Sequence, residues 1–423
     1  TRVELRPDPV IALRMPGERI YWSDWALNPS PDDEGLGADV AVSTTRTEEG
    51  GRVTWFGLRM DQGATALDEA RIDRILRNGL LWAAGTPSAA PSAWPGAARA
   101  ALVFVLDVEG VDEYVNALDA AAMFELEELP ITFFPVSQLV ENDDRLADAL
   151  ISAGEVGSQT VDHTPLVGMT TQEQSMRLDR SWRDIESWTG VGPAGLRAPE
   201  EAVDSITLRA WKQVGGSYVL AANEARTASP EVHETELGPI VLLPRVLKDD
   251  YTVIVRDVTL RSQGLVTAWL AGTKKLRAIG GLAIVAGHTQ IIVDGPRLDA
   301  VRTIADTVRA QGGWWLAQAD EAADWWLNRS AVEVRWTDAS MDPGPGFEAT
   351  DLPDLTVSIS TGSAVDDLWV DVVLPTEDER ILPTVDGVSV EYVDESWGMR
   401  VRVGSLIGGD LHRISFVTVA TTP

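Results

Sequence analysis

Between residues 99 and 330, short apolar runs alternate with helical stretches, and this alternation limits the possible fold more than any other feature of the chain. The runs have the length and content of buried strands: ALVFVL, PITFF, EVGSQT, GLRAP, SYVLAA, IVLLP and LAIVAG. Helical stretches such as RLADALISAG, EQSMRLDRSWRDIESW and RLDAVRTIADTVRAQGG separate most of them. This pattern predicts an α/β domain, a deformed β/α barrel with its reactive groups at the carboxyl ends of the strands.

The flanking regions have other patterns. Residues 1–95 alternate strand-like runs with acidic turns and end in a helical stretch, which predicts a strand-rich α/β domain. This region loosely resembles the end of an amidotransferase-like domain, although a chain without cysteine offers no thiol nucleophile. The proline-rich segment 85–98 is expected to be a linker. Residues 331–423 contain alternating strands bounded by Gly, Pro and Asp, which predicts a C-terminal β-sandwich.

Charge and composition exclude several classes of partner. The chain has 35 basic and 65 acidic residues, a net charge of −30, and would repel phosphate backbones and anionic lipid. We therefore expect neither nucleic acid nor a membrane surface as a partner, although the acidic excess is equally consistent with a solubilising surface or adaptation to salt. No apolar run approaches the ~18 residues of a membrane span. The absence of cysteine excludes disulfides and thiolate metal sites.

Two pairs of polar residues have spacings that suit a metal site. Asp107 and Glu109 are two residues apart at the end of an apolar run, so both carboxylates project from the same face of a strand. Gln159 and His163 are four apart, which makes them neighbours on a helical turn. Two acids and an imidazole that converge on one point could hold a divalent metal with an open position for water.

Four segments resemble, in order, the active-site motifs of the NodB-type polysaccharide deacetylases, a carbohydrate esterase 4-like family. They are ALVFVLDVEG (101–110), GSQTVDHTPL (157–166), GLRAPE (195–200) and LAIVAGHTQ (282–290). The chain has only four histidines, and two of them lie at motif positions. The resemblance implies a metal-dependent hydrolase that removes N-acetyl groups from a polysaccharide, secreted or at the cell surface, with a divalent metal, zinc, as cofactor.

The resemblance also implies a role for each motif residue. Asp107 corresponds to the general base, and Glu109 and His163 correspond to metal ligands. Arg197 corresponds to the arginine that orients the base. His288 corresponds to the general acid, whose pKa near neutrality suits proton delivery.

Two matches are incomplete. The acid that orients His288 is expected to be Asp249 or Asp250, with Asp250 preferred. Gln159 stands where the family has a second metal-binding histidine, and a neutral amide oxygen is a weaker zinc ligand than imidazole.

The change at Gln159 leaves three outcomes open: a weakly metallated deacetylase, an enzyme completed by another ligand such as Asp162, or a catalytically silent relative. In the last case the chain would be a glycan-binding or structural module of a cell-surface assembly. The identity of the polysaccharide, its linkage and the oligomeric state cannot be read from the sequence.

Overall fold

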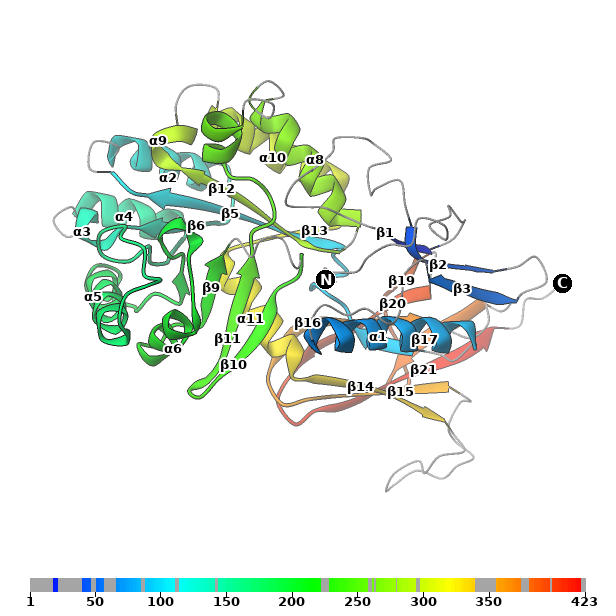
Figure 1. Ribbon diagram of the computed structural model, residues 1–423. Coiled ribbons are helices and arrows are strands. Elements are labelled where there is room, and N and C mark those ends of the chain that lie inside the picture. Colours follow the sequence, from blue (N-terminus) through cyan, green and yellow to red (C-terminus); the bar gives the residue numbers. More distant parts are fainter. Residues whose placement is uncertain are drawn as a thin grey trace. The chain divides into compact units, whose positions relative to one another are not determined.

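The computed structural model describes fifteen segments of the chain (Figure 1), namely residues 18–21, 40–46, 51–56, 66–84, 88–110, 114–140, 144–221, 228–257, 261, 264–278, 280–293, 297–338, 355–373, 380–395 and 398–419. By their contacts these residues divide into two compact units. One unit runs from Ala98 to Leu327, and the other combines described parts of the first 97 residues with the chain from Asn328 onward. None of the described helices is both long and apolar enough to cross a membrane.

A parallel sheet forms the centre of the first unit. Its middle strand, β5 (Ala100–Val108), is buried along its whole length, which explains why its sequence is an almost continuous apolar run. β12 (Leu282–His288) pairs with one edge of β5, while β13 (Trp314–Ala317) and β6 (Ile131–Pro135) pair with its first and second halves. β7 (Glu155–Val156) continues the sheet beyond β6. Parallel pairing brings the carboxyl ends of β5 and β12 to one edge, with Asp107 directly opposite His288.

A second sheet continues this row of strands. Its parallel strands are β8 (Gly195–Leu196), β9 (Tyr218–Ala221) and β11 (Gly238–Pro244), and β10 (Glu231–Thr235) pairs antiparallel with β11. A parallel bridge between Ser158 and Leu196 links the two sheets. The α/β class expected from the sequence is confirmed, and the strand order is compatible with a deformed barrel. Within the part of the chain that the structure covers, no pairing joins β11 or β10 to β12.

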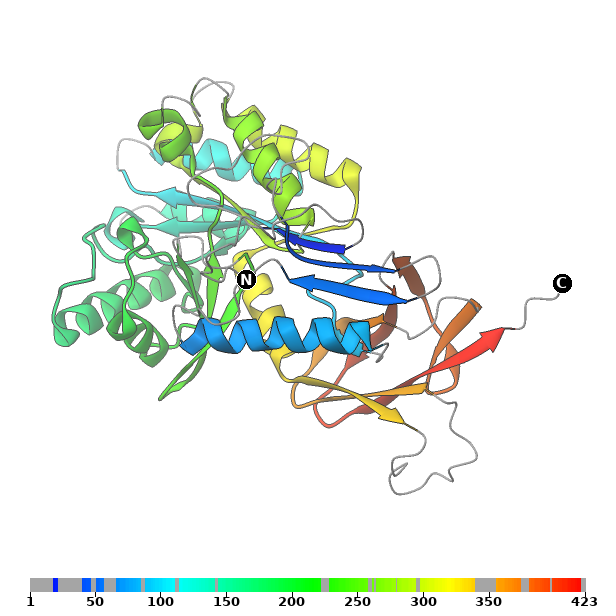
Figure 2. The same ribbon diagram turned by 45° about the vertical axis from the view of Figure 1, so that its right-hand side comes forward.

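Helices follow most of the strands, as the sequence pattern predicts. They are α2 (Tyr114–Leu126), α3 (Ser137–Val140), α4 (Asp144–Ala153), α5 (Thr171–Thr189), α6 (Ser205–Gln213), α8 (Leu265–Ala278), α9 (Thr289–Ile292), α10 (Arg297–Gln311) and α11 (Ala319–Ser330). Helix α5 begins with a capping box between Thr170 and Glu173 and ends at Gly190, whose φ of 75° suits a glycine C-cap. Helices α8 and α10 lie beside β12, β5 and β13 in both ribbon views (Figures 1 and 2).

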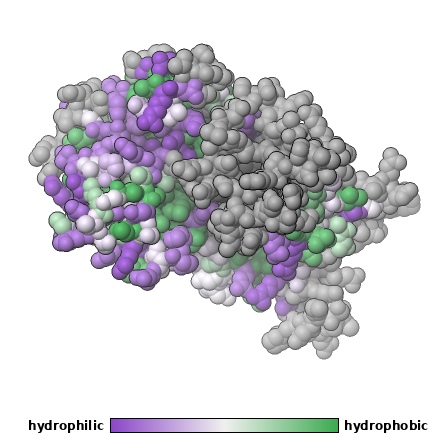
Figure 3. Space-filling model, viewed as in Figure 1, coloured by the Kyte–Doolittle hydropathy of each residue, from purple (hydrophilic) through white to green (hydrophobic). Residues whose placement is uncertain are grey.

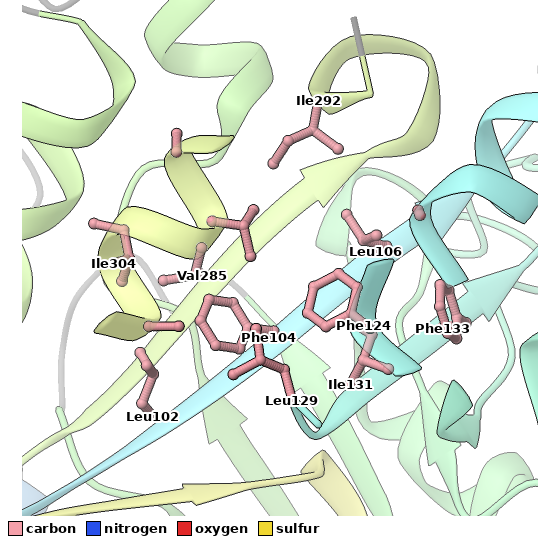
Figure 4. Close-up of a cluster of buried hydrophobic side chains, with 14 of the residues drawn as sticks. Leu102, Phe104, Leu106, Phe124, Leu129, Ile131, Phe133, Val285, Ile292 and Ile304 are labelled. Carbon is pink, nitrogen blue, oxygen red and sulfur yellow. The ribbon is translucent and has the colours of Figure 1, made fainter. Parts of the chain in front are cut away.

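The apolar core of the first unit lies between the central sheet and these helices. Phe104 and Leu106 of β5 pack with Phe124 of α2, Ile131 of β6 and Val285 of β12 (Figure 4). The rings of Phe104 and Phe124 meet edge to face, with centroids 5.7 Å apart. Burial of such a side chain stabilises the fold by about 1.5–3 kcal/mol, so the core holds the strands that carry the polar residues at their ends.

The outer face of this unit mixes hydrophilic and hydrophobic residues (Figure 3). Among the described residues of this unit, the exposed large apolar side chains include Val167, Met176 and Val191. Single exposed apolar residues are normal on a protein surface and indicate no binding patch by themselves.

The chain after residue 331 forms antiparallel sheets, as expected. One sheet has the order β14-β15-β21-β17-β18 and the other β19-β20-β16-β4. The strands are β14 (Val332–Asp338), β15 (Leu355–Thr361), β16 (Val365–Val373), β17 (Arg380–Val385), β18 (Val388–Ser389), β19 (Tyr392–Glu395), β20 (Gly398–Leu406) and β21 (Leu411–Val419).

The expectation of a linker at 85–98 is wrong. Ser88–Pro91 forms strand β4, which pairs antiparallel with β16, from Pro91 opposite Val370 to Ser88 opposite Val373. Trp94, three residues later, is fully buried. β4 lies at the edge of its sheet, where proline is tolerated because one side of the strand needs no ladder partner. The prolines therefore mark an edge strand.

Within the expected N-terminal domain, residues 1–95, three strands and one helix are described besides β4. β1 (Glu18–Tyr21), β2 (Val40–Arg46) and β3 (Arg52–Phe56) pair antiparallel, and α1 (Ala66–Ala83) follows. The Thr54 hydroxyl of β3 donates to the carbonyl of Gly79 on α1 at 2.8 Å. A Cβ at Gly79 would lie 2.6 Å from the Phe56 ring, so the close approach of helix and strand requires glycine there. Residues 1–17, 22–39, 47–50, 57–65 and 85–87 lie outside the described residues, and the status of residues 1–95 as a separate domain stays an expectation.

Candidate active site

Asp107 and His288 face each other across the carboxyl ends of the paired strands β5 and β12. The imidazole Nε2 of His288 lies 3.6 Å from Oδ2 of Asp107. Asp107 is almost completely buried, while the His288 side chain retains 14% of its exposure. An acid and an imidazole at such a strand edge are well placed for proton transfer.

Arg197 holds Asp107 from the second sheet. Its Nε donates to Oδ2 of Asp107 at 2.7 Å, and both side chains are buried. Burial raises the pKa of Asp107, and the positive charge of Arg197 opposes this rise. The guanidinium therefore fixes the direction of the Asp107 carboxyl group. The other oxygen of Asp107, Oδ1, accepts no hydrogen bond from the described residues.

Asp250 holds His288. The carboxylate accepts from Nδ1 of His288 at 2.7 Å and from its backbone N–H at 2.8 Å. Burial lowers the pKa of His288, but the Asp250 hydrogen bond and the charges of Asp107, Asp250 and Glu109 outweigh burial and raise this pKa to about 9. Of the two acids that the sequence left open, Asp250 contacts the ring, whereas Asp249 accepts from the Thr252 backbone and pairs with Arg245.

Glu109 lies beside this pair and is surrounded by donors. Its Oε1 accepts from Nε2 of Gln159 at 2.7 Å and lies 3.0 Å from Nε2 of His163. Its Oε2 accepts from Nε2 of Gln290 at 2.9 Å. Burial raises the pKa of Glu109, but the hydrogen bond with His163 and the nearby imidazoles lower it to about 2. The carboxylate therefore stays charged over the physiological range.

Gln159 and His163 reach Glu109 together, although not from a helical turn as expected. The chain turns here without forming a helix, and Thr160 and His163 have φ values of 70° and 56°. A positive φ is uncommon for residues with a Cβ. The side chains of Gln159 and His163 therefore lie near each other as expected, but a tight turn and not a helix brings them together.

The site contains a group of atoms suited to a divalent cation. One ligand atom each from Asp107, Glu109 and His288 lie within 4.8 Å of one another. His163 adds a second imidazole beside Glu109, at the distance given above. Asp162, considered as a substitute ligand, instead accepts from Arg177 at 2.5 Å and from the Thr164 backbone at 3.2 Å. The carboxylates and imidazoles present thus fit a divalent cation. The site has one imidazole fewer than the family motif, because Gln159 takes the place of a histidine.

Three further residues of the site were not expected from the sequence. Gln290 is one. The others are Glu201, which lies between Arg197 and Arg245, and Arg245 itself, whose Nη2 donates to Glu201 Oε2 at 2.7 Å. The charges of the two arginines lower the pKa of the buried Glu201 carboxyl group against the effect of burial. The available signals were the positions of Glu201, two residues after the R-A-P motif, and of Gln290, two residues after His288 in LAIVAGHTQ. Arg245 has no comparable signal.

Comparison with known proteins gives one family match, which lies within the first unit. Residues 112–219 match the family model described as polysaccharide deacetylase, a span that includes Gln159, His163 and Arg197. A search of curated proteins found no match.

Solved structures give matches of low sequence identity. A protein named as a polysaccharide deacetylase from Mycobacterium smegmatis has 21% identity and a TM-score of 0.48, with 56% of this chain and 92% of that chain covered. One so named from Pseudomonas aeruginosa has 17% identity and a TM-score of 0.49, with 55% and 92% covered. A carbohydrate esterase family 4 pseudoenzyme from Bacillus anthracis has 15% identity and a TM-score of 0.38, with 53% and 65% covered. The family match therefore covers residues 112–219, and it confirms the resemblance to the polysaccharide deacetylases over this span.

Proposed function

We propose that this protein is a metal-dependent hydrolase that removes N-acetyl groups from a polysaccharide outside the cell. The observation that carries the proposal is the Asp107–His288 pair, oriented on one side by Arg197 and on the other by Asp250. Amide hydrolysis requires an attacking water, stabilisation of an oxyanion and a proton for the departing amine. Each requirement has a candidate group within this corner of the domain.

Asp107 acts as the general base. Arg197 fixes one carboxylate oxygen, so Oδ1 is available to accept a proton from water. The buried position of Asp107 makes its carboxylate a stronger base than an exposed one, because burial raises its pKa.

His288 acts as the general acid. Asp250, as a carboxylate, can only accept a hydrogen bond, so Nδ1 of His288 carries a proton. Nε2 of His288 then faces Asp107, where the substrate would react. With a pKa raised to about 9, the imidazole is protonated at neutral pH and can give its Nε2 proton to the departing amine.

Glu109 and His163 would hold a divalent cation next to the Asp107 base and the His288 acid. Such a cation lowers the pKa of a bound water and polarises the carbonyl of the acetyl group. Zinc is the metal that the family resemblance implies, but Gln159 replaces one imidazole by an amide and weakens a zinc site.

A second function, that of a catalytically silent glycan-binding module, is favoured by one observation. Gln159 and Gln290 donate to both oxygens of Glu109, so this carboxylate is fully hydrogen-bonded without a metal. A module of this kind would bind the same N-acetylated polysaccharide and leave it intact.

Acetate release from N-acetylglucosamine oligomers, measured with added divalent cation, tests the proposal. The wild type should release acetate, while Asp107→Asn and His288→Gln should each lower kcat by at least ~100-fold, the usual range for loss of an acid or base. Asp179→Asn, an exposed ion-pair partner of Arg183 on α5, is the matched control and should keep full activity. Oligomer binding without acetate release by the wild type would favour the glycan-binding module.

A further inference from the structure

Buried oxygens without hydrogen-bond donors gather at the site. Among the described residues, the side-chain oxygens in this state include Oδ1 of Asp107 and, on the two segments that flank Glu109, Gln159 Oε1, Thr160 Oγ1, Thr289 Oγ1 and Gln290 Oε1. Gln159 is only 2% exposed. A buried acceptor that lacks a donor costs about 1–3 kcal/mol. Gln159 and Gln290 both contact Glu109 through Nε2, so each has its unpaired oxygen on an amide that already lies against this carboxylate.

The two glutamine amides can each present an oxygen in place of the nitrogen. A glutamine amide can turn by 180° and exchange the positions of its nitrogen and its oxygen. Without a cation, the N–H must face the Glu109 carboxylate, because two oxygens would repel each other. When a cation lies between the groups, the amide oxygen becomes the favourable end. The amide–carboxylate separations of 2.7 and 2.9 Å suit this exchange, because two oxygens bound at ~2.1 Å to an octahedral cation lie ~3 Å apart.

We propose that Gln159 and Gln290, together with Glu109, form an oxygen-ligand site for a cation of the Mg²⁺ or Mn²⁺ class in place of an imidazole-rich zinc site. The inference deepens the proposed function by naming the cation, and it rests on the same site. It assigns as a ligand Gln290, the last residue of the LAIVAGHTQ segment, to which the family resemblance gives no role. Gln159 becomes a ligand suited to a different ion and ceases to be a defect.

The donor types decide between the two classes of cation. Zinc favours imidazole and thiolate ligands, whereas Mg²⁺ and Mn²⁺ favour carboxylate, carbonyl and water oxygens. The chain has no cysteine, and of the two imidazoles beside Glu109, His163 is 38% exposed while Nδ1 of His288 is held by Asp250. Most of the buried atoms that could bind a cation here are therefore carboxylate and amide oxygens.

Calorimetric titration of the full chain with MnCl₂ and with ZnCl₂, after removal of cations by chelation, tests the proposal. The wild type should bind one Mn²⁺. Gln290→Leu should weaken Mn²⁺ binding at least tenfold and zinc binding less, while Gln311→Leu on α10 serves as the exposed control. Gln159→His should strengthen zinc binding by at least 100-fold without strengthening Mn²⁺ binding. An unchanged Mn²⁺ affinity in Gln290→Leu, or no Mn²⁺ binding by the wild type, overturns the proposal.

A second variant covers the case in which Gln290→Leu does not fold. Gln290→Glu places another carboxylate beside Glu109, so its Tm without cation should fall below that of the wild type, and Mn²⁺ should raise it by more than it raises the wild-type Tm. Equal Mn²⁺ shifts for the two proteins contradict the assignment.

The outcomes for cation and activity are separable. Mn²⁺ binding that depends on Gln290, without acetate release, sustains the cation site and removes the proposed hydrolase. Acetate release that follows zinc and ignores Gln290 sustains the hydrolase and removes the oxygen-ligand site.

Discussion

Asp250 binds His288 twice, accepting from the imidazole Nδ1 with one carboxylate oxygen and from the backbone N–H with the other. The two contacts fix both the ring and the end of strand β12 that carries it. The direction in which Nε2 points is thus a property of the fold before any substrate binds.

Asp250→Asn should lower the pKa of His288 from about 9 toward its ordinary value, because a neutral amide replaces the hydrogen-bonded negative charge. NMR titration of the imidazole in the cation-free protein measures this shift. Asp386→Asn, which removes the corresponding partner of His412, is the control and should leave the His288 titration unchanged. Identical His288 curves in wild type and Asp250→Asn contradict the assigned role of Asp250.

Replacing Glu201 by Gln should destabilise the protein by ~3 kcal/mol, because two buried guanidiniums, those of Arg197 and Arg245, lose the carboxylate between them. Urea unfolding followed by circular dichroism gives the free energy of unfolding. Asp179→Asn at an exposed pair should change it by no more than ~0.5 kcal/mol. A Glu201→Gln variant as stable as this control would show that Glu201 does not support the arginines.

Glu155→Gln should make the protein less sensitive to alkaline pH. Burial, with a smaller effect of Asp320, raises the pKa of Glu155 from 4.5 to about 8. The folded chain therefore keeps a proton that the unfolded chain releases, and stability falls as pH rises from about 4.5 to about 8. The neutral amide removes this loss, so the Tm difference between variant and wild type should grow from pH 5 to pH 8. Parallel Tm curves over this interval are the contrary result.

A fragment from Ala98 to Leu327 should unfold cooperatively by itself. These residues form a compact unit with its own core, whereas β4 and the strands after Asn328 belong to the other unit. Scanning calorimetry of the fragment checks this.

A truncated chain that keeps β4 but lacks β16 should be more prone to aggregation, because the backbone of β4 loses its strand partner and becomes exposed.

The sequence predicted those parts of the site that depend on local pattern. Apolar runs marked β5 and β12, and the position of Asp107 and His288 at their ends was enough to expect their encounter. The spacing of four predicted that Gln159 and His163 would reach the same place, and both contact Glu109, although a turn with positive φ at Thr160 and His163 brings them there.

The remaining parts depend on contacts that no local pattern reveals. Gln290 meets Glu109 across 181 positions of sequence, and Arg245 meets Glu201 across 44. Strand β4 was missed because its prolines are typical of linkers as well as of edge strands. In each case the deciding partner lies far away in the chain.

The most direct test of the central claim is acetate release from an N-acetylglucosamine oligomer, measured while cation is added back to the chelated wild-type protein. Activity should be absent after chelation, rise in proportion to added cation, and saturate at one cation per chain, because water activation requires the ion beside Asp107 and Glu109. Acetate release that persists in chelator, or a chain that binds its cation and the oligomer but never releases acetate, would contradict the assignment of this site as a metal-dependent deacetylase.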